Sequence, residues 1–212
     1  MIRRIAALSL AALLTLPALA QAATWKIDPN HSSVRFQVRH MFAKVQGNFT
    51  QFSGSIEYDP ANPTASKVEA KIVAASINTN TQRRDDDLRS PDFFDVATYP
   101  DLSFTSTKVD TAAGGLKVTG DLTMHGVTKP VVLDVEILGM GPHPMIPGGQ
   151  VAGFSARGKI NRQDFGIKWN KTLDNGGTLV GDDVDLQFDV EAVNAPPKPA
   201  EPAKPGTPSK SG

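Results

Sequence analysis

The sequence predicts an all-β protein whose antiparallel strands form a barrel or a sandwich, and three observations support this. Apolar and polar residues alternate in segment after segment between residues 34 and 192, which is typical of strands with one dry and one wet face. Turn-forming residues separate several of these segments. A single stretch, residues 80–95, has the composition of a helix.

Eight alternating segments follow one another along the chain. In the last of them Val184, Leu186 and Phe188 share one face, with acidic residues between them. Trp25 begins a candidate short strand ahead of the eight, over residues 25–27. The turn at Gly114 and Gly115 predicts a hairpin, and residues 139–149, rich in Gly and Pro, predict another turn. The eight segments are residues 33–39, 44–58, 67–77, 102–109, 116–124, 130–138, 151–160 and 183–192.

The second segment changes phase in its middle. Val45 and Phe49 share one face, whereas the numbering of Phe52 and Ile56 would put them on the opposite face. Because a slip of one residue exchanges the two faces of a strand, we expect a bulge or a sharp bend near residues 50–51. Long, bent strands are what the closure of a sheet requires.

The helical stretch has a polar N-cap candidate, good helix formers over residues 82–89, and Pro91 to end the helix. Its charged residues predict an exposed face, and its large apolar residues predict an anchor to the core. The expected exposed residues are Arg83, Arg84, Asp85, Asp86 and Asp87, and the expected anchor residues are Leu88, Phe93 and Phe94.

The two ends of the chain differ from the part between them. Residues 1–22 combine Arg3 and Arg4, an apolar run and small residues before position 22, the layout of a signal peptide cleaved after Ala22. A membrane anchor is the alternative, but a core of about 15 residues is short for a bilayer. Export to the periplasm is therefore expected. We expect residues 23–193 to form the barrel domain and the Pro-rich residues 194–212 a disordered tail.

Charge and composition exclude several classes of function. Without Arg3 and Arg4 the chain has 20 Lys and Arg against 22 Asp and Glu, so nothing favours nucleic acid or anionic membranes as partners. There is no cysteine, so the exported fold depends on its core alone.

No pattern of catalytic or metal-binding residues stands out. His31, His40, His125 and His143 show no metal-ligand spacing, and nucleophile elbows, phosphate loops and dinucleotide fingerprints are missing. We therefore predict no catalytic residue, no metal and no cofactor. His125, between a strand and Gly126, is expected to hold a turn by a hydrogen bond to the backbone.

Five strings in order resemble the YceI-like family, from about residue 25 to residue 193. They are DPNHSSVRFQVRH at 28–40, GNF and FSG at 47–54, RD, LRSPDFFD and YP at 84–100, LTMHGVTKPV at 122–131, and NRQDFG at 161–166. The resemblance implies an exported, extended, eight-stranded antiparallel β-barrel of lipocalin-like shape, with one short helical insertion around residues 81–95. It also implies an interior channel that holds a long-chain isoprenoid or another amphiphilic lipid. A homodimer is an expectation at the level of the family only.

A lipid channel needs an apolar lining, because each buried methylene contributes about 0.8 kcal/mol, and a polar mouth for the head group. Near that mouth we expect Arg35, Arg162, Trp169 and Asn170, whose alternative roles are solvated or capping side chains. The alternative for the apolar set is a filled, ligand-free core. The predicted lining is Phe36, Val38, Phe49, Ile56, Ile72, Phe104, Leu122, Leu133, Val135, Phe154, Ala156, Leu186 and Phe188.

Three functions are considered for this chain. The first is a periplasmic carrier that sequesters a long-chain isoprenoid, a quinone-like molecule or a fatty amphiphile by burial, without chemistry. The second is an enzyme acting on such a lipid, with His125 or His40 as acid or base. The third is an envelope stress or interaction protein with a filled barrel, whose tail finds a partner.

Overall fold

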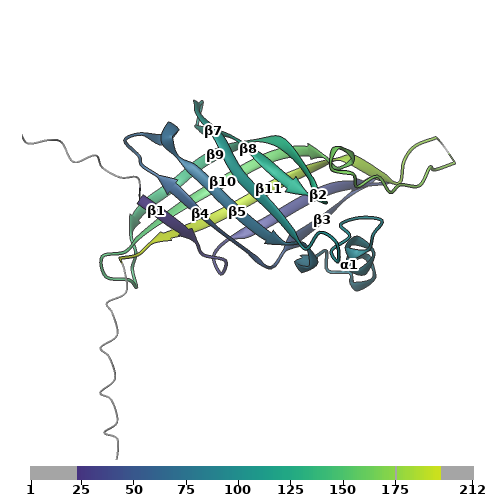
Figure 1. Cartoon of the computed structure of the whole chain (residues 1–212), viewed down its shortest axis with the longest axis horizontal. Helices are drawn as coiled ribbons and strands as arrows, with labels where there is room; N and C mark the ends of the chain where they lie inside the picture. The colour runs from purple at the N-terminus through teal and green to yellow at the C-terminus, as the bar shows by residue number, and fades with distance from the viewer. Residues whose placement is uncertain (1–22, 175, 197–212) are drawn as a thin grey trace, which may run out of the picture.

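The computed structural model describes residues 23–174 and 176–196, and in it eleven strands form one antiparallel sheet that closes on itself (Figure 1). A short helix, α1 (Gln82–Arg89), lies at one end of the barrel. The strands are β1 (Ala23–Ile27), β2 (Ser33–His40), β3 (Ala43–Phe49), β4 (Phe52–Tyr58), β5 (Lys67–Val73), β6 (Ile77–Asn78), β7 (Asp101–Ala112), β8 (Gly115–Met124), β9 (Val127–Pro142), β10 (Gln150–Asn161) and β11 (Val180–Asn194).

The eleven strands fill eight positions around the ring, which confirms the predicted eight-stranded barrel. β1 and β2 lie one after the other along the same edge of β11, β3 and β4 are two halves of one bent strand, and β6 continues β5 after a 3₁₀ turn. The barrel thereby excludes the sandwich that the alternation alone left open.

The predicted bend occurs at Thr50 and Gln51, between β3 and β4. Both backbone N–H groups turn away from the ladder: that of Thr50 donates to the carbonyl of Ser76 (3.1 Å) and that of Gln51 to the Ser76 hydroxyl (3.1 Å). Phe49 then pairs with Ile77 and Phe52 with Ile72. The bend thus returns both halves of the strand to the same inner face.

Two strands run further than predicted. β9 continues to Pro142, into residues that we expected to form a turn, and β7 continues to Ala112. The extension of β9 is accommodated by an irregularity opposite Gly153 and Phe154, where the register against β10 shifts. Gly and Pro residues therefore mark a distorted strand here and not its end. The hairpin at Gly114, whose φ is 85°, is confirmed.

Helix α1 confirms the helical insertion, but Asp85 is not on an exposed face. It is 5% exposed, and its carboxylate accepts hydrogen bonds from the backbone N–H (2.8 Å) and the hydroxyl (2.5 Å) of Thr79. Arg89 fastens the helix to the strand beside it by donating to the carbonyls of Ala75 and Ile77 (2.8 Å each). Leu88 packs against the core, as predicted.

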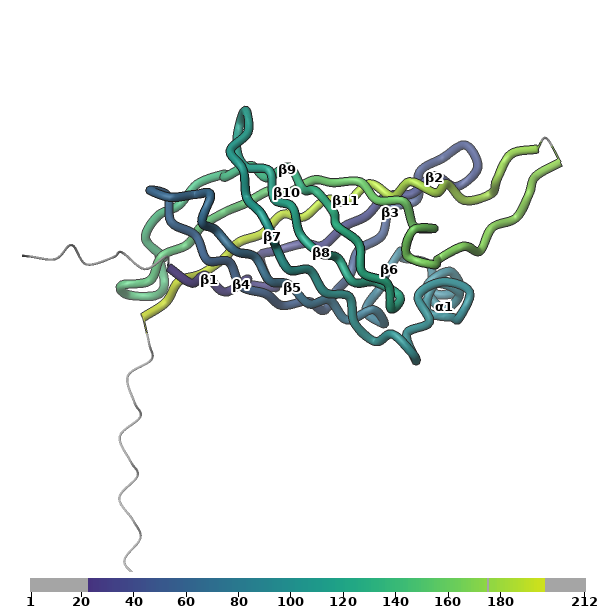
Figure 2. Tube along the Cα trace, turned by 45° about the horizontal axis from the view of Figure 1, so that its top comes forward, coloured from purple at the N-terminus to yellow at the C-terminus, as the bar shows by residue number. Residues whose placement is uncertain are grey.

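The two ends of the described chain lie together at the end of the barrel opposite α1 (Figure 2). Asn194, expected in the tail, is still part of β11, and its amide donates to the carbonyl of Thr24 (2.8 Å). The predicted signal peptide and residues 197–212 of the predicted tail lie outside the described residues. Among the residues that are described, no helix is long and apolar enough to cross a membrane.

Candidate functional site

The interior of the barrel contains two apolar hollows. The helix-side hollow, next to α1, has a volume of about 120 Å³, and the far hollow, toward the other end, has a volume of about 150 Å³. Both are lined by Val34, Ile72, Leu122, Leu186 and Phe188. These five shared side chains, which we call the waist, are what separates the two spaces.

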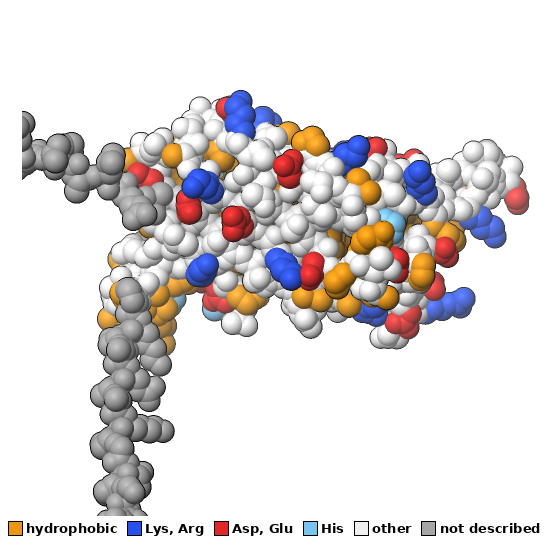
Figure 3. Space-filling model, viewed as in Figure 1, with side chains coloured by type: hydrophobic (Ala, Val, Ile, Leu, Met, Phe, Trp, Pro, Cys, Tyr) orange, Lys and Arg blue, Asp and Glu red, His pale blue; other side chains and the backbone are white. Residues whose placement is uncertain are grey.

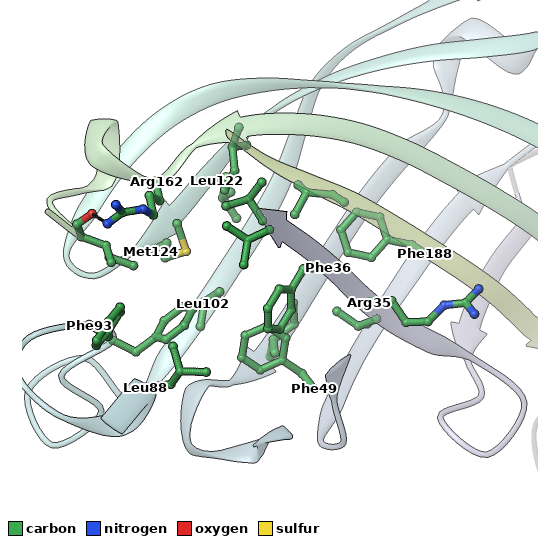
Figure 4. A pocket seen from close by; sticks show the side chains of 18 of the residues that line it. Arg35, Phe36, Phe49, Leu88, Phe93, Leu102, Leu122, Met124, Arg162 and Phe188 are labelled. Carbon is green, nitrogen blue, oxygen red and sulfur yellow. Dashed lines mark hydrogen bonds between the residues drawn. The ribbon is translucent and has the colours of Figure 1, made fainter. Parts of the chain in front are cut away.

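Phenylalanine rings pack against one another in the wall of the helix-side hollow (Figure 4). The ring centroids of Phe36 and Phe49 are 5.8 Å apart, and Phe49 meets Phe94 edge to face, also at 5.8 Å. Leu88 of α1 and Phe93 close this hollow from the helix side. The helical insertion therefore supplies the cap of the barrel as well as part of its wall.

The far hollow is lined by aliphatic, small and aromatic side chains. The small side chains of Ala70 and Ala156 in its lining leave space inside the barrel. The Tyr58 ring packs edge to face on the Phe154 ring, with ring centroids 5.6 Å apart. Burial, and then the nearby Asp59 carboxylate, raise the pKa of Tyr58. Trp25, 3% exposed, belongs to the same core cluster.

All thirteen predicted lining residues border one or both hollows. Period-two alternation suffices to find them because inward positions on a closed sheet have nowhere else to point. Their contact with a ligand stays a prediction.

Arg162 lies in the wall of the helix-side hollow and is 5% exposed. Its guanidinium donates to the carbonyls of Gly181 (2.9 Å), Ile167 (2.8 Å) and Trp169 (2.9 Å), and to the Asp182 carboxylate (3.2 Å). Burial lowers the pKa of Arg162, and Asp182 opposes that shift. These four hydrogen bonds hold the segment after β10 against β11, and a contact of Arg162 with a head group stays a prediction.

The other three predicted head-group residues do not converge on one point. The Arg35 guanidinium forms an ion pair with Asp189 outside the barrel and points away from the other labelled side chains of Figure 4. Asn170 exchanges two hydrogen bonds with the backbone of Val180 (2.7 and 3.0 Å). Trp169 packs on Phe93 with ring centroids 5.2 Å apart.

A more open groove of about 480 Å³ adjoins the helix-side hollow and shares Phe36, Val38, Leu88, Phe93 and Val180 with it. Apolar side chains gather at this end of the molecule among charges of both signs (Figure 3). The sequence did not identify this groove, because the polar segment 79–92 meets the apolar side chains of Val38 and Val45 only in the fold. The polar residues of the groove are His40, Thr79, Thr81, Arg83, Arg84, Asp87, Ser90 and Asp92.

Two of these groove residues differ in how they are held. Arg84 donates to the hydroxyl of Thr79 (2.8 Å) and to its carbonyl (2.8 Å), which fixes its guanidinium. The side chain of Arg83 makes no hydrogen bond or ion pair with the residues that the structure describes. Its guanidinium is therefore a cation in the groove whose N–H groups are available to a ligand.

Histidines have structural contacts in the barrel. Nδ1 of His125 lies 3.1 Å from the carbonyl oxygen of Phe165, and its ring packs on Tyr99. The φ of His125 is 51° and that of the following Gly126 is 72°, so this pair makes the turn between β8 and β9 as expected. Nδ1 of His143 accepts hydrogen bonds from the backbone N–H groups of Met145 (3.1 Å) and Ile146 (3.2 Å).

Comparison with known proteins relates this architecture to one family. Residues 25–192 match the family model described as YceI-like domain. The protein YceI of Escherichia coli O17:K52:H18 is 42% identical over 189 residues, covering 88% of this chain and 95% of the relative.

Solved structures agree with this assignment. The crystal structure of the Campylobacter jejuni YCEI protein is 38% identical, with a TM-score of 0.61 over 73% of this chain and 88% of that one. A polyisoprenoid binding domain from Saccharophagus degradans has a TM-score of 0.55 over 83% of this chain and 100% of that one; at 19% identity it supports the fold alone. The chain belongs to the YceI-like family.

Proposed function

We propose that this protein binds a long-chain isoprenoid, a quinone-like molecule or a fatty amphiphile in its barrel and carries it through the periplasm. The observation that supports this most is the pair of apolar hollows that share one waist along the barrel. Such a lining buries a hydrocarbon chain without chemistry. Export of the protein rests on the predicted signal peptide, and a homodimer stays a prediction.

Binding of a long chain requires the waist to open. Apolar cavities of about 150 Å³ hold benzene, whereas sites for larger ligands have roughly 300–1,000 Å³. Rotation of Phe188 and Leu186, both partly exposed to the two spaces, would join the hollows into one channel. Ten buried methylenes contribute roughly 8 kcal/mol, more than the roughly 0.5–1.5 kcal/mol that each immobilised side chain costs.

The groove beside α1 is the place where the ligand's polar head would stay in water. Its apolar residues continue into the helix-side hollow, while Arg83 and Thr81 face the groove. Polyisoprenoid binding is the property named for the Saccharophagus degradans domain, and a chain with a polar end suits the same arrangement here.

The two alternatives make different demands on the same residues. An enzyme would need an acid or base at the ligand. Nδ1 of His125 is directed to the Phe165 carbonyl, so His40, which lines the groove, is the histidine that such an enzyme would use. A filled scaffold would keep the waist closed permanently. The carrier is preferred because the groove adjoins the hollow without a polar barrier.

The test is uptake of a fluorescent long-chain lipid by protein that has first been stripped of lipid. Wild type should bind one molecule, and Ala156→Phe, which fills the far hollow, should weaken binding at least tenfold. Arg157→Phe is the matched control, since Arg157 is the next residue of β10 and is exposed. No uptake by wild type, or equal loss in both variants, would reject the carrier in favour of a filled barrel.

A further inference from the structure

The barrel closes at a seam where β11 changes partner. Lys26 and Ile27 of β1 pair with Val193 and Ala192, whereas the same edge of β11 pairs with β2 between Val180 and Asp189. Residues 28–32 form the corner that crosses between these two partners, and Glu191 lies opposite this corner.

Hydrogen bonds to the backbone of Glu191 fix the corner to β11. The N–H of Asp28 donates to the carbonyl of Glu191 (2.9 Å). The Ser32 hydroxyl donates to the same carbonyl (3.2 Å) and accepts from the Glu191 N–H (3.0 Å). The side chains that project here therefore start from a backbone held at both ends.

Three of those side chains bring potential metal ligands together. Asp28, His31 and Glu191 each offer one ligand atom, and these atoms all lie within 4.8 Å of one another. Nδ1 of His31 is 2.8 Å from the Asp28 carboxylate and 3.6 Å from the Glu191 carboxylate. The second oxygen of Asp28 accepts from the N–H of Asn30 (2.9 Å), which orients that carboxylate.

The two separations from His31 are compatible with a tetrahedral metal centre. With metal–ligand bonds of about 2.0–2.2 Å, neighbouring ligand atoms are about 3.4 Å apart, and the two measured separations lie on either side of this value. One imidazole with two carboxylates, and a fourth position left for water, is a donor set that suits Zn²⁺ and related ions. His31 is 66% exposed at its side chain, so an ion reaches the site from solvent.

We propose that Asp28, His31 and Glu191 form a binding site for a divalent transition-metal ion such as Zn²⁺, which fastens the seam of the barrel. Three ligands from the corner and from β11 join the two sides of the closure. Without the ion the same groups form an ion pair, in which the Asp28 carboxylate raises the pKa of His31. The site stands apart from the hollows and does not depend on the proposed lipid.

The experiment is titration of the mature chain, without a histidine tag, with Zn²⁺ by calorimetry and with Co²⁺ by absorption spectroscopy. We expect one equivalent of Zn²⁺ to bind and the melting temperature to rise with it. His31→Ala and Glu191→Gln should each weaken binding at least tenfold and abolish the rise in melting temperature. His40→Ala is the matched control, an exposed histidine outside the cluster, and should bind as wild type does.

Circular dichroism of each variant establishes that it is folded before titration. The lipid-uptake assay is run in parallel, since loss of the metal site should leave it unchanged. Absence of saturable binding, or one-equivalent binding that survives in folded His31→Ala, would overturn the proposal.

Discussion

The two hollows of the barrel are formed by the same alternating strands, but they are closed in different ways. The helix-side hollow is capped by α1 and by a segment that the buried Arg162 holds with hydrogen bonds. At the far hollow Tyr58 packs on Phe154, and Trp25 donates a hydrogen bond to the carbonyl of Tyr58 (3.4 Å). The regular strands therefore form the walls of both hollows, and an irregular segment closes the helix side.

The largest expected effect on stability is that of replacing the buried Arg162. Arg162→Met removes four hydrogen bonds and leaves three carbonyls that lose their donor. An unsatisfied buried polar group costs about 1–3 kcal/mol, so the free energy of unfolding should fall by about 3 kcal/mol or more in urea denaturation. Arg35→Met, on the outer face, should change it by less than about 1 kcal/mol. Equal effects would mean that Arg162 does not hold the helix-side closure.

Two glycines, each in contact with a phenylalanine ring that lines one of the hollows, allow the two walls to be compared. A Cβ at Gly120 would overlap the Phe104 ring of the far hollow and lie 2.7 Å from the carbonyl oxygen of Thr105, which cannot move away. A Cβ at Gly47 would overlap the Phe36 ring of the helix-side hollow and meet only side-chain atoms.

Gly120→Ala should therefore cost about 1–3 kcal/mol of unfolding free energy and Gly47→Ala about 1 kcal/mol. Urea denaturation of both variants measures the difference. A larger loss in Gly47→Ala would show that the helix-side wall is the less adaptable of the two.

Lipid chain length separates the roles of the hollows. Val38 borders both the groove and the helix-side hollow, whereas Ala156 borders the far hollow. Val38→Trp should weaken binding of short and long lipids alike by about tenfold, or 1.4 kcal/mol. Ala156→Phe should weaken binding of long chains only, in competition assays with a series of chain lengths. The reverse pattern would place the entrance at the far end.

The smallest expected effect is at alkaline pH. Burial raises the pKa of Tyr58 above its ordinary value near 10, so its contribution to stability is complete below that value and is lost as pH rises through the folded-state pKa. Melting temperatures above pH 10 should fall, and Tyr58→Phe should fall less steeply. The difference in tyrosinate absorbance between wild type and Tyr58→Phe during the titration isolates Tyr58; a midpoint at or below the ordinary value would contradict the assignment.

The inner surface of the barrel could be predicted from the sequence because it depends on a local pattern. Phe49 and Phe52 even revealed the bend at residues 50–51, since their phases conflict. A two-residue period needs no knowledge of which strands are neighbours.

The mouth could not be predicted in the same way. Arg83 and Val38 line the same groove although they lie far apart in the sequence. Asp85 is buried and accepts a hydrogen bond from Thr79, which no sequence pattern shows. Arg162 was predicted to lie near the mouth as a head-group residue, but three of its partners are backbone carbonyls, which have no sequence signature. Polar sites of this kind depend on tertiary contacts between irregular segments.

The central claim is that the space enclosed by this sheet accommodates a hydrocarbon chain. Native mass spectrometry of protein isolated gently from its own cells tests this most directly, followed by extraction and identification of whatever is bound. We predict one bound lipid per barrel, displaced when excess isoprenoid is added. A mass equal to that of the polypeptide alone, unchanged after incubation with long-chain isoprenoids and fatty amphiphiles, would contradict it.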